Sequence, residues 1–157
     1  MNDVRPTIAG PRTLSMTVLM TPDMVNFSGK VHGGALLKLL DEVAFSCAAR
    51  YSGHYVVTLL VDEARFREPV LVGELVTFLA TVNWIGRTSM EIGVRVESED
   101  HRTRTNRHVM SCFFVMVAMD DTGEPVAIPR FEPDDDTARR RWDEAEQRQH
   151  LRRSARP

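Results

Sequence analysis

The residues most able to carry chemistry in this chain lie between Asn26 and Glu42. Asp41 follows Leu40 in a segment that is otherwise largely apolar. Removing a carboxylate from water is costly unless the group is paired or reaches a wet cleft. Asp41 is therefore a candidate catalytic base or nucleophile, and an ion pair with an arginine in a subunit interface explains it equally well. Glu42 is expected to be a solvated or interface charge.

Two adjacent glycines, Gly33 and Gly34, precede this apolar segment. At the start of a helix their backbone N–H groups can meet a ligand oxygen, and the helix dipole favours negative charge developing there. A tight turn that needs the conformational freedom of glycine explains the pair as well. His32 could act as a general base by residue type, but a histidine before a helix is as often a structural hydrogen-bonding group.

The elements that must position these residues follow from hydrophobic periodicity. Apolar residues alternate from Leu14 to Met20, as in a half-buried strand. Ala35 to Tyr51 is rich in helix formers and apolar on nearly every side, and Gly53 ends it. Four alternating, β-branched stretches follow, separated by turn residues: Tyr55–Phe66, Glu74–Trp84, Thr88–Glu99 and Arg107–Met119. This order predicts an α+β domain in which one antiparallel sheet curls around a single helix.

The chain is expected to divide into three parts. Residues 1–12 form a flexible N-terminus, residues 13–133 the folded domain, and residues 134–157 a polar tail. The tail begins with three acidic residues, which favour a helix start. Only Trp142, Ala145 and Leu151 are available to pack, so we expect this helix to lie on the surface.

Composition excludes several function classes. The net charge of −2, with basic residues spread among acidic ones, gives no basic field for nucleic acid. Cys47 and Cys112 lie in apolar segments and are expected to be small core residues in a reducing compartment. The N-terminus lacks the apolar run of a secretory segment, and no stretch is long enough to span a membrane. We therefore expect a soluble, cytoplasmic protein.

The common catalytic motifs are missing from the sequence. It has no Gly-x-Ser-x-Gly elbow, no His-Glu-x-x-His pair and no glycine-rich dinucleotide or phosphate loop. A serine triad, a zinc site and a nucleotide hydrolase therefore lose their usual support, and no metal ligand is predicted.

From Asn26 to Glu42 the sequence resembles the cytosolic acyl-CoA hydrolase family, which includes brain acyl-CoA hydrolase and bacterial YciA-type enzymes. The matching features are an Asn-x-x-Gly-x-Val-His-Gly-Gly entry and a Leu-Leu-Lys-Leu-Leu-Asp-Glu-Val-Ala helix. The resemblance extends from about Thr13 to Arg153. It includes Val61-Asp62, Phe66, Val72-Gly73-Glu74, Arg87 to Ile92, Phe113-Phe114 and Ile128-Pro129.

The resemblance implies a hot-dog fold and hydrolysis of acyl-CoA thioesters to free acid and CoA. It places a catalytic Asn26 and Asp41 on opposite sides of a subunit interface, in a homodimer that we expect to assemble further into a trimer of dimers, a hexamer. Asp41 would act as general base on water or as nucleophile through an anhydride, Asn26 would orient the water, and the Gly34 N–H would polarise the thioester oxygen.

The same resemblance suggests where CoA binds. Gly33 and the strand start at Arg87, Thr88, Ser89 and Met90 would offer it backbone groups and one cation, although a plain turn with a solvated Arg87 explains the latter segment almost as well. No cofactor is implied, because CoA is part of the substrate and product. Two alternatives stay open: an enoyl-CoA hydratase or dehydratase using His32 with Asp41 or Glu42, and a non-catalytic module that binds acyl-CoA.

Overall fold

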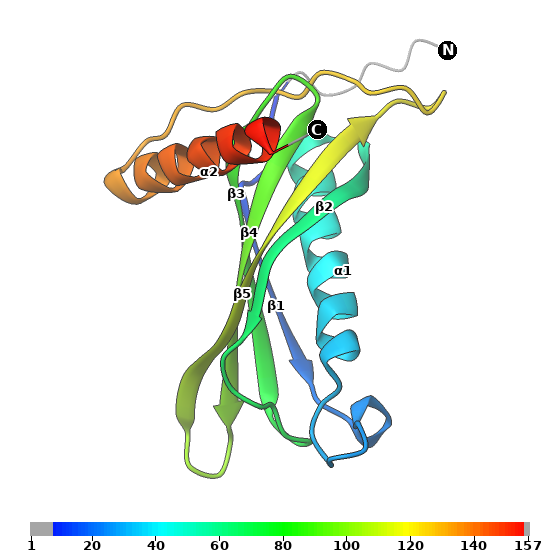
Figure 1. Ribbon diagram of the computed structural model, residues 1–157, viewed down its shortest axis with the longest axis vertical. Coiled ribbons are helices and arrows are strands. Elements are labelled where there is room, and N and C mark those ends of the chain that lie inside the picture. The colour runs from blue at the N-terminus through cyan, green and yellow to red at the C-terminus, as the bar shows by residue number, and fades with distance from the viewer. Residues whose placement is uncertain (1–7, 156–157) are drawn as a thin grey trace.

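One five-stranded antiparallel sheet wraps around one long helix, as the sequence predicts (Figure 1). The computed structural model describes residues 8–155. Its strands are β1 (Thr13–Leu19), β2 (Tyr55–Phe66), β3 (Leu75–Ile85), β4 (Ser89–Asp100) and β5 (Thr105–Met119), arranged in the order β1-β3-β4-β5-β2. The helices are α1 (Gly33–Ser52), α2 (Asp136–Ser154) and a short 3-10 turn, η1 (Pro22–Met24). The predicted element boundaries agree with these within about two residues.

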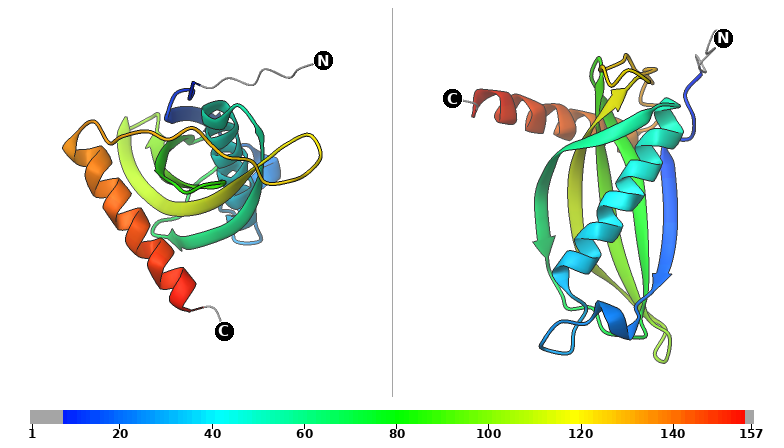
Figure 2. Two further views of the ribbon diagram at one scale, coloured as in Figure 1. Left: turned by 90° about the horizontal axis from the view of Figure 1, so that it is seen from above. Right: turned by 90° about the vertical axis from the view of Figure 1, so that its right-hand side faces the viewer.

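Helix α1 lies in the concave side of the sheet (Figure 2). It begins at the N-cap His32, and Gly53 ends it in the left-handed conformation at φ 71°. Leu40, Val43 and Cys47 are completely buried and pack against the inner side chains of the strands. Burying each large apolar side chain contributes about 1.5–3 kcal/mol, so this contact is the main stabilising feature of the domain.

Strand β2 is an edge of the sheet and pairs only with β5. Its register shifts twice, between Thr58 and Leu60 and between Asp62 and Arg65. The outer half of the strand leaves apolar side chains in solvent: Leu59, Leu60, Val61 and Phe66. An edge strand with exposed apolar side chains is a surface on which another chain can pair.

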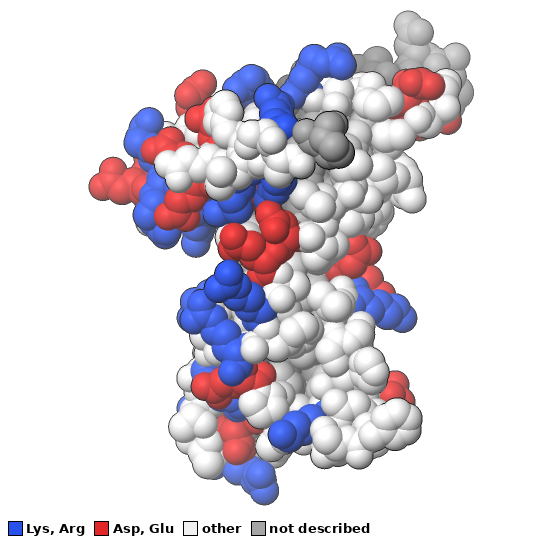
Figure 3. Space-filling view, viewed as in Figure 1, with Lys and Arg blue, Asp and Glu red and all other residues white. Residues whose placement is uncertain are grey.

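Helix α2 lies on the opposite, convex face of the sheet (Figures 1 and 2). Ala145 is buried and Trp142 packs against the core, as predicted, but Leu151 is 68% exposed and its predicted packing role is wrong. The helix is anchored instead by arginines that reach Glu91, a carboxylate with no exposed surface. Figure 3 shows charged side chains gathered over α2, whereas the side over α1 is mostly uncharged.

Two further expectations concern residues outside the sheet and in the core. Residues 1–7 of the predicted flexible N-terminus lie outside the described residues, whereas Gly10 N–H donates to the Tyr51 carbonyl at 2.9 Å.

Cys47 and Cys112 are buried free thiols, and burial raises the pKa of each to about 11. Among residues 8–155, no helix is long and apolar enough to cross a membrane.

Candidate functional site

Asp41 on α1 contacts the edge strand β2 through the side chain of Thr58. It is partly buried on α1, and the Thr58 hydroxyl of β2 donates to its Oδ1 at 2.6 Å. This short hydrogen bond to a carboxylate fixes the orientation of the group. Within the described part of the chain, no lysine or arginine forms an ion pair with Asp41. Its neighbour Glu42 is exposed and lies 3.9 Å from Lys38, as expected of a solvated charge.

Thr58 was not predicted from the sequence. Its hydroxyl also lies 3.4 Å from the Met116 sulfur. Thr58 is exposed and Asp41 is only partly buried, so solvent reaches both residues. A threonine in a β-branched strand looks like an ordinary strand residue, so only the packing of β2 against α1 reveals its partner.

Asn26 organises the loop between η1 and α1. Its Oδ1 accepts hydrogen bonds from the Ser28 N–H at 2.9 Å, the Ser28 hydroxyl at 2.7 Å and the Lys30 N–H at 3.2 Å. Its own N–H donates to the Lys30 carbonyl at 2.7 Å. The Asn26 side-chain oxygen is therefore committed to the loop. The Nδ2 group has no partner among the described residues, so it can act as a donor to a ligand.

The two glycine amides differ in availability. The Gly34 N–H donates to Nδ1 of the N-cap His32 at 2.9 Å. In this structure it is therefore not available for its predicted role, which is to polarise a ligand oxygen. The Gly33 N–H has no acceptor among residues 8–155. His32 accordingly has a capping role here, and the accepting Nδ1 means that its proton is on Nε2.

The Arg87–Met90 segment, predicted to bind CoA, runs from the turn between β3 and β4 into the first two residues of β4. Arg87 is exposed, and its carbonyl accepts from the Ile128 N–H at 3.1 Å; the Thr88 carbonyl accepts from Ala118 at 2.9 Å. The Met90 side chain is fully buried in the core, so it takes no part in the backbone contacts with CoA that are predicted for this segment.

Ser89 faces the convex side of the sheet. There it lines a cavity of about 470 Å³ together with Leu60, Val115, Arg152 and Arg153. The cavity thus combines apolar walls with two cationic side chains.

One chain does not bring all the predicted catalytic groups together. Thr58 and Asp41 are in contact, and Asn26 lies in the loop that leads to Gly33. Gly33 and Asp41, however, are about 12 Å apart along α1 at ~1.5 Å per residue. Groups that act on one carbonyl each lie about 3 Å from it. Within one chain these candidate residues therefore form two separate groups. We call the group of Asp41 and Thr58 the Asp41 half-site, and the group of Asn26 and Gly33 the Asn26 half-site.

Comparisons with known proteins show which family the chain belongs to. The thioesterase superfamily model matches residues 28–105. Protein VdlD of Helicobacter pylori is 45% identical over 139 residues, which cover 88% of this chain and 79% of that protein. An acyl-CoA thioesterase solved as an apo hexamer has a TM-score of 0.87 at 31% identity, with 92% of this chain and 94% of that chain covered.

An acyl-CoA hydrolase from Staphylococcus aureus, solved with butyryl-CoA, CoA and CoA disulfide, is similar as well. Its TM-score is 0.84 at 28% identity, covering 90% of this chain and 87% of that chain. It has also been solved with an Asn, an Asp or a Thr replaced by Ala. With identity above 30% to a thioesterase that it covers almost completely, this chain belongs to the acyl-CoA hydrolases of the thioesterase superfamily and has the hot-dog fold.

Proposed function

We propose that this enzyme hydrolyses fatty acyl-CoA thioesters, with Asp41 as general base or nucleophile. The observation that carries the proposal is the 2.6 Å hydrogen bond that orients a carboxylate in an otherwise apolar helix. Asn26, Asp41 and Thr58 are also separated along the chain by the same intervals as the Asn, Asp and Thr replaced in the S. aureus enzyme.

In the water-mediated form of the reaction, Asp41 accepts a proton from water as the water oxygen bonds to the thioester carbon. The carbonyl π electrons move onto the oxygen, and the resulting oxyanion needs hydrogen-bond donors. When the carbonyl re-forms, the C–S bond breaks and CoA leaves as a thiolate that takes up the proton. Thiolate is a good leaving group, so no strong general acid is needed. In the alternative form, a carboxylate oxygen of Asp41 attacks the thioester carbon, and the C–S bond breaks to release CoA thiolate and leave a mixed anhydride. Water then hydrolyses the anhydride to the free acid and the Asp41 carboxylate, and the proton that water loses neutralises the thiolate.

The donors we propose differ in part from those expected from the sequence. The Gly33 N–H and the Asn26 Nδ2 are the available groups, because Gly34 is engaged by His32. Loss of a single oxyanion donor typically costs ~10²–10³ in rate. The Gly33 N–H also lies at the positive end of the α1 dipole. Gly34 would serve only if His32 turned away.

We further propose that two chains complete each site. Two observations support a site made by two chains: the edge strand β2 exposes apolar side chains, and the two half-sites of one chain are separated. Two-fold pairing would set the Asn26 half-site of one protomer against the Asp41 half-site of its partner, giving two equal sites. A trimer of such dimers is the proposed larger assembly, since one of the similar enzymes is a hexamer.

CoA is proposed to bind near Arg87, Thr88, Ser89 and Gly33, with the exposed Arg87 as a cation for its phosphates. No other cofactor is required by the proposed chemistry. The hydratase alternative is less well supported, because it needs His32 to transfer protons while its Nδ1 holds the helix cap. A module that only binds acyl-CoA does not explain an oriented, solvent-accessible carboxylate.

The direct test is Asp41→Asn, which keeps the shape of the side chain and removes its basic charge. We expect thiol release from acyl-CoA to fall at least ~10²-fold, as general bases typically contribute ~10²–10⁴. Glu42→Gln is the matched control, because Glu42 is the neighbouring but exposed carboxylate. Near-normal turnover by Asp41→Asn at the correct oligomer size would contradict the proposed role. Hydration of enoyl-CoA by the wild type would favour the hydratase.

A further inference from the structure

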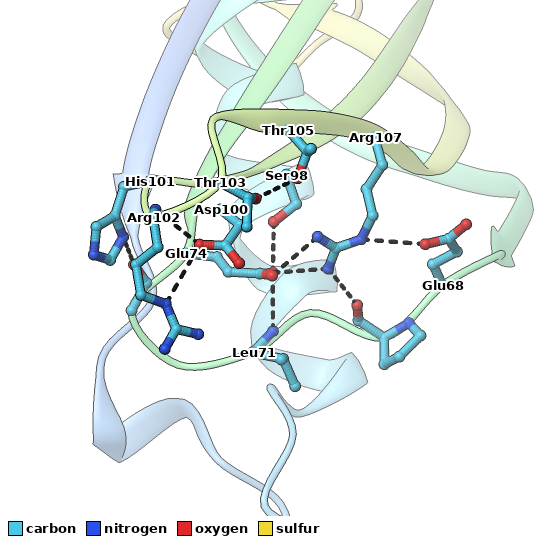
Figure 4. Close-up of polar contacts among 12 residues, drawn as sticks. Glu68, Leu71, Glu74, Ser98, Asp100, His101, Arg102, Thr103, Thr105 and Arg107 are labelled. Atoms are coloured by element: carbon cyan, nitrogen blue, oxygen red, sulfur yellow. Dashed lines mark hydrogen bonds and ion pairs between the residues drawn. The ribbon is translucent and has the colours of Figure 1, made fainter.

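An ion pair between the buried Glu74 and the partly exposed Arg107 lies at the end of the sheet close to the start of α1 (Figure 4). Only 8% of the Glu74 side chain is exposed. Arg107 donates to its Oε1 through Nη1 at 2.9 Å and to its Oε2 through Nη2 at 2.8 Å. Ser98 Oγ donates to the same Oε2 at 2.8 Å. We call Glu74, Ser98 and Arg107 the carboxylate clamp.

The clamp holds the loop between β2 and β3. The Leu71 N–H donates to Glu74 Oε2 at 3.1 Å, and Arg107 Nη2 donates to the Pro69 carbonyl at 2.8 Å. Arg107 Nε also lies 3.2 Å from Glu68 Oε2. The planar guanidinium is thus bound on three sides, which fixes the loop in angle as well as in position.

This loop is in turn the support for the Asn26 half-site. The Val31 N–H donates to the Val70 carbonyl at 2.9 Å, and both valine side chains are buried. The next residue along the chain is His32, the N-cap of α1. A continuous series of short contacts therefore runs from the clamp to the proposed Gly33 and Asn26 donors.

Because Glu74 is buried and the Arg107 side chain is 28% exposed, the ion pair is partly desolvated. Replacing such a pair with packed apolar residues is often neutral or stabilising, because desolvation offsets the attraction between the charges. A bidentate pair does supply a fixed geometry, and small displacements of catalytic groups are costly: a ~1 Å error can cost ~10²-fold in rate.

We infer that Glu74 and Arg107 are positioning residues for the Asn26 half-site, which they serve through the β2–β3 loop. The inference rests on the proposed thioesterase mechanism and its shared site. In the proposed dimer, each chain contributes Asn26 to one site and Asp41 to the other. A clamp substitution in one chain should therefore impair the site that uses the Asn26 of that chain and leave intact the site that uses its Asp41.

The first experiment measures steady-state hydrolysis by Glu74→Gln and Arg107→Gln. We expect kcat to fall about tenfold or more, with KM changed less than about twofold, because orientation is lost while CoA contacts are kept. Arg148→Gln is the matched control, since it removes an arginine from Glu91, the other buried glutamate among residues 8–155, which lies under α2. An equal loss of kcat in Arg148→Gln would overturn the inference.

The second experiment locates the defect by subunit exchange. Random re-pairing of two variants in equal amounts makes about half of the dimers mixed. Mixing Glu74→Gln with Asp41→Asn should create one intact site per mixed dimer, and so about a quarter of wild-type sites. Mixing Glu74→Gln with Asn26→Ala should give no more than the mean of the two parents, because both lesions lie in the same half-site.

The Asn26→Ala and Asp41→Asn pair serves as the control for the shared site itself. If that pair fails to recover activity although mass measurements confirm exchange, the shared site is wrong and the inference falls with it. The positioning role alone is wrong if that pair recovers activity and either of two results is found. One is that mixing Glu74→Gln with Asp41→Asn restores no activity; the other is that mixing Glu74→Gln with Asn26→Ala raises activity above the mean of the two parents. Should Glu74→Gln not fold, Arg107→Lys enters the same crosses, as it keeps a cation opposite Glu74 without the bidentate fork.

Discussion

Replacing Thr58 by valine tests whether the hydroxyl that contacts Asp41 matters for turnover. Valine keeps the β-branched shape and suits a strand, so the change removes only the hydroxyl. A hydrogen bond to a charged group contributes about 1.5–3 kcal/mol. Because Thr58 is exposed, water can replace part of the interaction, and we take the lower value. Each 1.36 kcal/mol of barrier is tenfold in rate, so kcat/KM should fall about tenfold.

The assay is the release of CoA thiol from a series of acyl-CoA substrates, measured under kcat/KM conditions. Thr58→Ser is the matched control, since it restores a hydroxyl at the same position and should recover most of the activity. Loss of this hydrogen bond should lower the Tm of Thr58→Val by only about 3–6 °C, whereas the Tm of Thr58→Ser should be nearly unchanged. Full activity of Thr58→Val, or a Thr58→Ser variant as slow as Thr58→Val, would refute the view that this hydroxyl orients Asp41.

Three other outcomes are expected. His32→Ala should keep substantial activity and lose about 1 kcal/mol of unfolding free energy through the lost cap, measured by urea titration; a loss of turnover like that of Asp41→Asn would favour the dehydratase alternative. Burial alone would raise the pKa of Glu74, but hydrogen bonds from Arg107, Leu71 and Ser98 outweigh it and hold the pKa below its ordinary value of 4.5. The clamp's contribution to stability should therefore be present at neutral pH and decline as the pH falls below about 4.5. The unfolding free energies of wild type and Glu74→Gln should then converge in acid, and a difference between them that does not change with pH would contradict this. Arg152→Gln should cost about 1.5–3 kcal/mol of unfolding free energy, because Arg152 contacts both Asp62 and Glu91, whereas Leu151→Gln should change it by less than about 0.5 kcal/mol.

Most of the fold could be predicted from periodicity. The all-round apolar character of Ala35 to Tyr51 requires a surrounding sheet, and the strands alternate with clear turn residues between them. The anchoring of α2 could not be predicted in the same way. Its arginines look like solvated charges until the fold places Glu91 beneath them, and a carboxylate within a strand gives no sign of its distant partners.

The candidate site was only partly predictable for a related reason. Asp41 stands out because a charge is unusual in an apolar helix, but Thr58 has no unusual residue type in its strand. The choice between the Gly33 and Gly34 amides depends on the rotamer of His32, which residue spacing does not determine.

The strand order has a consequence for how the chain is made. β2 leaves the ribosome directly after α1, but its only strand partner among residues 8–155 is β5, the last strand to be synthesised. At ~5–20 residues per second, the apolar edge of β2 waits several seconds for that partner. During this interval it is open to the strands of neighbouring nascent chains. Slower translation between Phe66 and Thr105 should therefore lower the yield of native protein more than slower translation after Met119.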